Sequence, residues 1–76
     1  MRIDKEDAEA MVLEAFHGSK ALTLDEVSRR TNMRRGDVSG AVARCVIAGK
    51  LRESGHVFDP AARSEQRLFS LIQEAR

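Results

Sequence analysis

The sequence predicts a small, mainly α-helical domain in which three helices are followed by a β-hairpin. Across the first two thirds of the chain, apolar residues recur at helical spacing in successive segments bounded by helix-capping residues. The last third has short apolar stretches separated by turn residues, a pattern typical of strands. A chain of 76 residues has room for one domain, which we expect to span residues 1–76.

The first helix is expected at about residues 4–17. Asp4 is placed to cap it, and acidic side chains in its early turns favour the positive end of the helix dipole. Gly18 suits the left-handed position after the helix. Ala21 and Leu22 are expected to form a short extended link. The apolar face of the helix consists of Ala8, Met11, Val12, Ala15 and Phe16.

Residues 23–49 are expected to form two short helices joined by a tight turn. Thr23 and Glu26 have the spacing of a capping box, so the first of these helices should begin near Leu24. Asn32 tolerates the left-handed conformation that a helix end requires. The residues expected to be buried along this helix and in the turn are Leu24, Val27, Ser28 and Met33.

The third helix is expected at about residues 35–48, ending at Gly49. Its buried face should consist of Val38, Ala41, Val42, Cys45 and Ala48. Its outer face carries a strip of small side chains: Gly36, Ser39, Gly40 and Ala43. A glycine in mid-helix, as at Gly40, costs about 1 kcal/mol relative to alanine, so a compensating reason for it is expected.

Residues 50–72 are expected to form a β-hairpin whose tip lies at residues 59–64, with a turn at Ser54-Gly55. The alternative is a fourth helix over residues 61–75, which local propensity favours. We prefer the hairpin, because otherwise residues 51–58 would form an isolated ribbon, and such ribbons are marginally stable.

Charge is distributed unevenly along the chain. The net charge is only +1, but residues 1–27 carry three basic against seven acidic side chains, and residues 28–76 carry ten basic against five acidic. Within residues 29–52, seven basic side chains are opposed only by Asp37. Such a local excess of positive charge is what contacts to phosphates require.

Several function classes lack support in the sequence. No apolar run approaches the roughly 20 residues of a membrane span, and the acidic N-terminus does not look like a secretory signal. One cysteine, Cys45, fits a reducing cytoplasm and a place in the core. His17 and His56 lack the spacing of metal ligands, and no catalytic arrangement is evident. We therefore expect a cytoplasmic protein that is not an enzyme and uses no cofactor or metal, and we expect no small-molecule pocket.

Residues 22–55 resemble the core of bacterial and phage winged helix-turn-helix regulators. The matching residues are Leu22, Thr23, Glu26, Val27, Thr31, Met33, Val38, Val42, Cys45, Gly49 and Leu51. The Ser-Gly, Asp-Pro and Ala-Arg pairs of residues 54–71 are similar to the wing of small phage-type members, with Arg63 where a tip arginine is common. Two departures are the small residues on helix three and Cys45 in place of the usual leucine.

The resemblance implies a winged helix-turn-helix that binds double-stranded DNA with helix three in the major groove, as a transcriptional regulator of a phage, plasmid or bacterial operon. Arg34 and Arg35 are the best candidates for reading guanine edges. A homodimer is expected, with Met11, Val12 and Phe16 as its contact. The candidate DNA-binding residues are Thr23, Arg29, Arg30, Arg34, Arg35, Ser39, Gly40, Arg44, Lys50, Arg52, Arg63 and Arg67.

Two alternatives share this fold. One is a protein-interaction module, either an adaptor or a phage-encoded inhibitor, which would bind a protein partner. The acidic N-terminal half, the near-neutral net charge and the small-residue strip on helix three favour it. The other is a recombination directionality factor.

Overall fold

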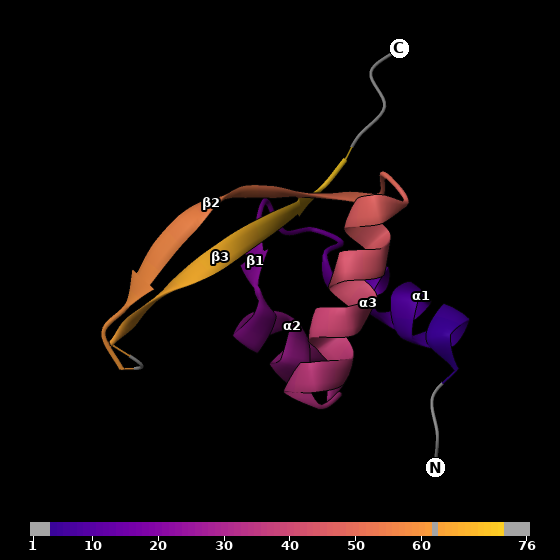
Figure 1. Ribbon diagram of the computed structural model, residues 1–76, viewed down its shortest axis with the longest axis horizontal. Coiled ribbons are helices and arrows are strands. Elements are labelled where there is room, and N and C mark those ends of the chain that lie inside the picture. Colours follow the sequence, from indigo (N-terminus) through magenta and orange to yellow (C-terminus); the bar gives the residue numbers. More distant parts are fainter. Residues whose placement is uncertain (1–3, 62, 73–76) are drawn as a thin grey trace.

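The computed structural model describes residues 4–61 and 63–72, and there three helices pack on a three-stranded antiparallel sheet (Figure 1). The helices are α1 (Lys5–Ala15), α2 (Leu24–Thr31) and α3 (Arg35–Ile47). The strands are β1 (Leu22–Thr23), β2 (Leu51–Asp59) and β3 (Ser64–Leu71), in the sheet order β1-β3-β2. The predicted helices and hairpin are thus present, and the hairpin extends away from the helices.

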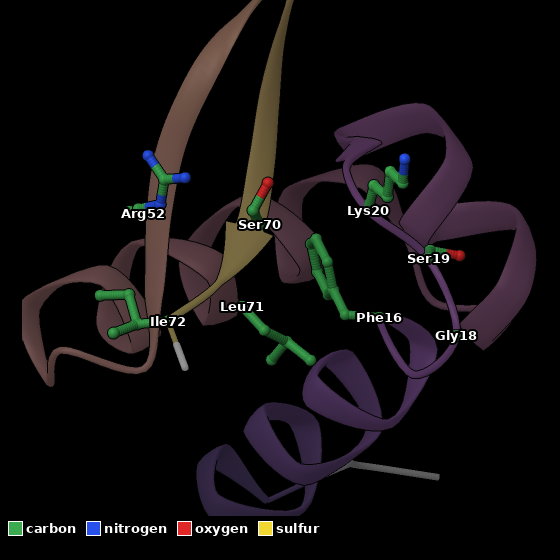
Figure 2. Close-up of a pocket in the computed structure, with 8 residues that line it drawn as sticks. All are labelled: Phe16, Gly18, Ser19, Lys20, Arg52, Ser70, Leu71 and Ile72. Atoms are coloured by element: carbon green, nitrogen blue, oxygen red, sulfur yellow. The ribbon is translucent and has the colours of Figure 1, made fainter. Parts of the chain in front are cut away.

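The β2–β3 hairpin has two faces with different neighbours. Successive side chains of a strand point to opposite sides. Glu53 and Phe69 line a groove beside α3. Arg52 and Ser70 are register partners, and both face the loop that follows α1 (Figure 2). The root of the hairpin is therefore enclosed by α3 on one side and by the α1–β1 loop on the other.

In the C-terminal third, the expected turn at Ser54-Gly55 was wrong, and the preferred strand after the hairpin tip was confirmed. Residues 54–55 do not form a turn, because Gly55 lies within β2 at a register shift, where the strand accommodates a bulge and pairing with β3 continues. Residues 64–71 are a strand and not part of a fourth helix. They gain partners on both sides, since Leu22 of the expected extended link forms strand β1 together with Thr23, and β1 pairs with β3 at Leu22↔Phe69 and Thr23↔Leu68. The end of the alternative helix, residues 73–75, lies outside the described residues.

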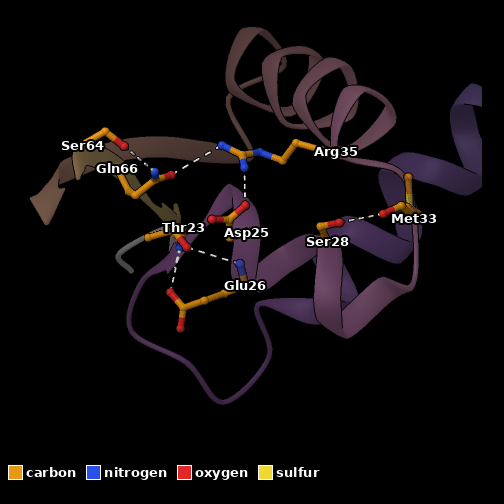
Figure 3. Close-up of polar contacts among 8 residues, drawn as sticks. All are labelled: Thr23, Asp25, Glu26, Ser28, Met33, Arg35, Ser64 and Gln66. Carbon is orange, nitrogen blue, oxygen red and sulfur yellow. Dashed lines mark hydrogen bonds and ion pairs between the residues drawn. The ribbon is translucent and has the colours of Figure 1, made fainter. Parts of the chain in front are cut away.

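The expected helix ends are confirmed for α2 and α3. The Oγ1 of Thr23 accepts a hydrogen bond from the backbone N–H of Glu26 at 3.2 Å, and the N–H of Thr23 donates to Oε1 of Glu26 at 3.0 Å (Figure 3). Asn32 and Gly49 have positive φ, at 61° and 77°. Asp4 is the N-cap residue of α1, but its exposed side chain makes no capping hydrogen bond, contrary to expectation.

The capping box gives a stability prediction. Thr23→Ala should lower the free energy of unfolding by about 0.5–2 kcal/mol, because the backbone N–H of Glu26 loses its acceptor, the Oγ1 of Thr23. Thr23→Ser keeps the hydroxyl and is the matched control. Urea unfolding followed by circular dichroism measures both, and an unchanged midpoint for Thr23→Ala would show that the box contributes nothing.

One hydrophobic core joins the helices to the sheet. Its buried residues are Ala8, Val12, Phe16, Leu22, Val27, Met33, Val38, Ala41, Val42, Cys45, Leu51 and Phe69. Some residues expected inside are not: Ala48 is exposed, Met11 is 37% exposed, and Leu24 and Ser28 are half-buried. Ala48 is the C-cap residue of α3, where the chain turns away from the core.

The face of α1 proposed as a dimer contact is used by the protein itself. Val12 and Phe16 are 0% exposed, because a three-helix core of this size needs both side chains. Neither can contact a second copy, so that part of the expectation was wrong. None of the described helices is long and apolar enough to cross a membrane.

Candidate nucleic-acid interface

Arg34 is the most available cation at the start of α3. It is the N-cap residue of that helix, in an extended conformation with φ −65° and ψ 145°, and it is exposed. Its side chain has no hydrogen-bond or ion-pair partner among residues 4–61 and 63–72. The guanidinium can therefore bind an external acceptor without breaking a hydrogen bond or ion pair to those residues.

Arg35, the next residue, is held in place by two other elements. It forms an ion pair with Asp25 at the start of α2, and its Nη2 donates to Oε1 of Gln66 on β3 at 3.4 Å (Figure 3). Nε2 of Gln66 in turn donates to Oγ of Ser64 at 3.2 Å. The side chain of Arg35 remains 48% exposed, so it is oriented and still accessible.

Arg29 lies close to the same group of residues. It is exposed in the last turn of α2 and lines a hollow between α2 and the hairpin together with Gln66, Val57 and Phe58. Because Gln66 also accepts the hydrogen bond from Arg35, the two arginines lie on the same side of the hairpin. The side chains of Val57 and Phe58 are 43% and 60% exposed.

Two other predicted arginines have structural roles that the sequence did not reveal. Nη1 of Arg30 donates to the carbonyl of Ala15 at 3.0 Å and to Oγ of Ser19 at 2.7 Å, which ties α2 to the loop after α1. Nε of Arg44 lies 3.1 Å from Oε2 of Glu9 and links α3 to α1. Each would have to give up these contacts to bind a ligand fully.

Arg67 and Thr23 are also engaged within the protein. The guanidinium of Arg67 pairs with Glu53 at 3.3 Å, and its central carbon lies 5.4 Å from the centre of the Phe69 ring. Thr23 is 7% exposed, and its hydroxyl belongs to the capping box.

The remaining candidates divide between the two faces of the molecule. Ser39 is exposed and lines the groove of about 270 Å³ between α3 and the hairpin, while Gly40 is half-buried on the same helix. Arg63 is exposed at the hairpin tip with φ 53°. Lys50 is exposed just after α3, and Arg52 points to the other face of the hairpin, beside the loop after α1. The structure thus does not gather all twelve predicted residues on one surface.

The interface also contains features that the sequence-based prediction missed. Asp25 and Gln66 orient Arg35, and nothing in their spacing indicates that they meet. Val46, on the outer part of α3 where the groove ends, is 37% exposed.

Cys45 is 0% exposed in the core. Burial, followed by the negative charge of Glu9, raises the pKa of its thiol. A thiol with a raised pKa stays protonated at neutral pH, so Cys45 acts as the small core side chain that was predicted.

A solved structure with a similar fold is that of BpsR from Bordetella bronchiseptica, determined in work on how 6-hydroxynicotinic acid regulates its DNA binding. The two sequences are 29% identical, and the superposition has a TM-score of 0.68. It covers 86% of the present chain and 46% of BpsR, so the chain spans about half the length of that protein. No protein-family model matches the sequence, and no curated protein matches it.

Proposed function

We propose that this chain is the double-stranded DNA-binding domain of a transcriptional regulator of a phage, plasmid or bacterial operon, acting in the cytoplasm. In this proposal α3 enters the major groove and the β2–β3 hairpin lies along the adjacent backbone. The observation that carries it is the exposed and unpaired Arg34 at the start of α3, followed by the oriented Arg35. The likeness to BpsR, whose DNA binding has been described, supports it.

The small side chains on α3 fit close approach to DNA. Gly36, Ser39 and Ala43 are exposed, and Gly40 is half-buried between them. With few long side chains to reach base edges, recognition would depend on the arginines at the helix start and on DNA shape. A domain of this size gives limited specificity, so we propose that it binds repeated sites as a homodimer.

Salt dependence of binding tests the proposal. Four arginines are available to phosphates on the proposed surface, namely Arg29, Arg34, Arg35 and Arg63. Four phosphate contacts predict an affinity for duplex DNA that falls about a hundredfold between about 50 and 200 mM salt. Fluorescence anisotropy with a labelled random duplex measures this fall. No detectable binding at the low-salt end would reject DNA binding.

Gly40 provides a prediction that separates stability from binding. A Cβ added there meets only Nη1 of Arg44, at 3.4 Å, which is an ordinary contact with a flexible side chain. Gly40→Ala should therefore stabilise the domain by about 0.5–1 kcal/mol through helix propensity. If α3 lies in the groove, the same variant should bind DNA more weakly, because the methyl group meets the duplex. Greater stability with unchanged affinity would mean that this face of α3 is not in contact with DNA.

The second candidate function is a protein-interaction module. The groove between α3 and the hairpin favours it, since Ala43, Val46 and Ile47 give it an apolar lining and Ile47 is 86% exposed. Exposed apolar surface of this kind is typical of protein-binding sites. In that case, Ile47→Glu would abolish partner binding, and removing the charges of Arg34 and Arg35 would leave it unchanged.

A further inference from the structure

A second hollow, of about 580 Å³, lies on the face of the hairpin away from the groove beside α3 (Figure 2). It is bounded by the loop between α1 and β1 and by the root of the hairpin. Its volume is within the range of small-molecule sites, roughly 300–1,000 Å³. The proposed DNA-binding surface does not use it, and no small-molecule pocket was expected from the sequence.

Among the described residues that line this hollow, all the charged side chains are positive. Lys20 from the loop and Arg52 from β2 stand on either side of Ser70, as Figure 2 shows, and no acidic residue lines the hollow. Both cationic side chains are exposed, and neither forms an ion pair with another described residue. Two cations around one concavity, with no counter-charge among residues 4–61 and 63–72, favour an anion.

The walls of the hollow are held by hydrogen bonds. Ser19 accepts from Arg30 at 2.7 Å and keeps its own hydroxyl proton for donation, and its backbone N–H donates to the carbonyl of Phe16 at 3.1 Å. Ser70 is 8% exposed and its hydroxyl donates to Ser54 at 2.9 Å. The loop and the hairpin root are therefore ordered before any ligand binds, which lowers the entropic cost of binding.

The hollow also offers apolar surface. Leu71 is half-buried and Ile72 is 42% exposed, and both line it next to the fully buried ring of Phe16. A ligand that is anionic at one end and apolar at the other would contact both parts. Inorganic ions would use only the charged part.

We propose that this hollow binds a small organic anion. Its carboxylate or phosphate lies between Lys20 and Arg52 and accepts from their ammonium and guanidinium groups, and its apolar part covers Leu71 and Ile72. Such a ligand would connect the α1–β1 loop to the hairpin. The inference stands independently of DNA binding.

The test is a titration of the full ¹⁵N-labelled chain followed by amide chemical shifts, with no DNA present. Benzoate and phenyl phosphate are the probes, and benzamide is the neutral analogue of benzoate. We expect saturable shifts centred on Lys20, Arg52 and Ser70 for at least one anion and none for benzamide. The two probes distinguish a carboxylate ligand from a phosphate ligand.

Variants locate the site. Arg52→Ala and Lys20→Ala should each weaken anion binding by about tenfold, the size expected for losing one charge-assisted hydrogen bond. Lys5→Ala removes an exposed charge from α1 and should change nothing. Equal binding of benzamide, shifts that do not saturate, or unchanged affinity in both variants would overturn the proposal. If Arg52→Ala lost DNA binding but kept its affinity for benzoate, Lys20 and Arg52 would be assigned to DNA binding instead.

Discussion

Arg34→Ala should reduce the affinity for duplex DNA by about tenfold to a hundredfold while leaving the thermal stability unchanged. The size follows from the loss of one exposed guanidinium contact to a base edge or phosphate, worth roughly 1–3 kcal/mol. Stability should not change, since this side chain has no partner among the described residues. Adding Arg35→Ala should lower affinity by a smaller further factor, because Asp25 already compensates part of its charge.

The salt dependence of binding and a control variant show how Arg34 contributes to the affinity for DNA. If Arg34 contacts a phosphate, the slope of log affinity against log salt falls by about one unit, whereas a base contact relaxes sequence preference and changes the slope less. Lys5→Ala is the matched control, since it removes one exposed positive charge from α1. Equal losses in both variants would indicate a general charge effect. No loss in either would favour the protein-interaction module.

Local signals predicted the helix ends at the start of α2 and at the ends of α2 and α3, but failed at the Asp4 cap and at the Ser54-Gly55 turn. Thr23 and Glu26 are three residues apart, so their capping box can be predicted without knowing the rest of the fold. Asn32 and Gly49 mark helix ends because few residues adopt positive φ at low cost. The hairpin was also predicted, but on the argument that a lone ribbon is unstable and not on propensity.

Which side chains meet at the site could not be predicted, because the ion pairs there join residues that are distant in the sequence. Asp25 meets Arg35, and Glu9 meets Arg44, only after the helices have packed. The strongly positive charge of residues 29–52 therefore overstates the charge available to a ligand, since Arg44 is compensated. The faces of the hairpin likewise follow from register, which the bulge at Gly55 shifts.

The largest loss of stability is expected for a substitution in the core. Phe16→Ala should reduce the free energy of unfolding by about 3–5 kcal/mol, because the ring is 0% exposed and its removal leaves a cavity. Natural domains are stable by only about 5–15 kcal/mol, so this variant should be close to unfolding at room temperature. The chain has no Trp, and far-ultraviolet circular dichroism in urea is the appropriate measurement.

Phe58→Ala is the matched control, with the same chemical change at a ring that is 60% exposed on the hairpin. It should change stability by less than about 0.5 kcal/mol, because an exposed ring leaves no cavity. With a urea dependence of about 1–3 kcal/mol per molar, the midpoint of Phe16→Ala should fall by about 1 M or more, and that of Phe58→Ala should stay near wild type. Equal shifts in the two variants would contradict the placement of Phe16, at the end of α1, in the core. That placement positions the loop with Lys20 beside the hairpin root, so the anion site depends on it as well.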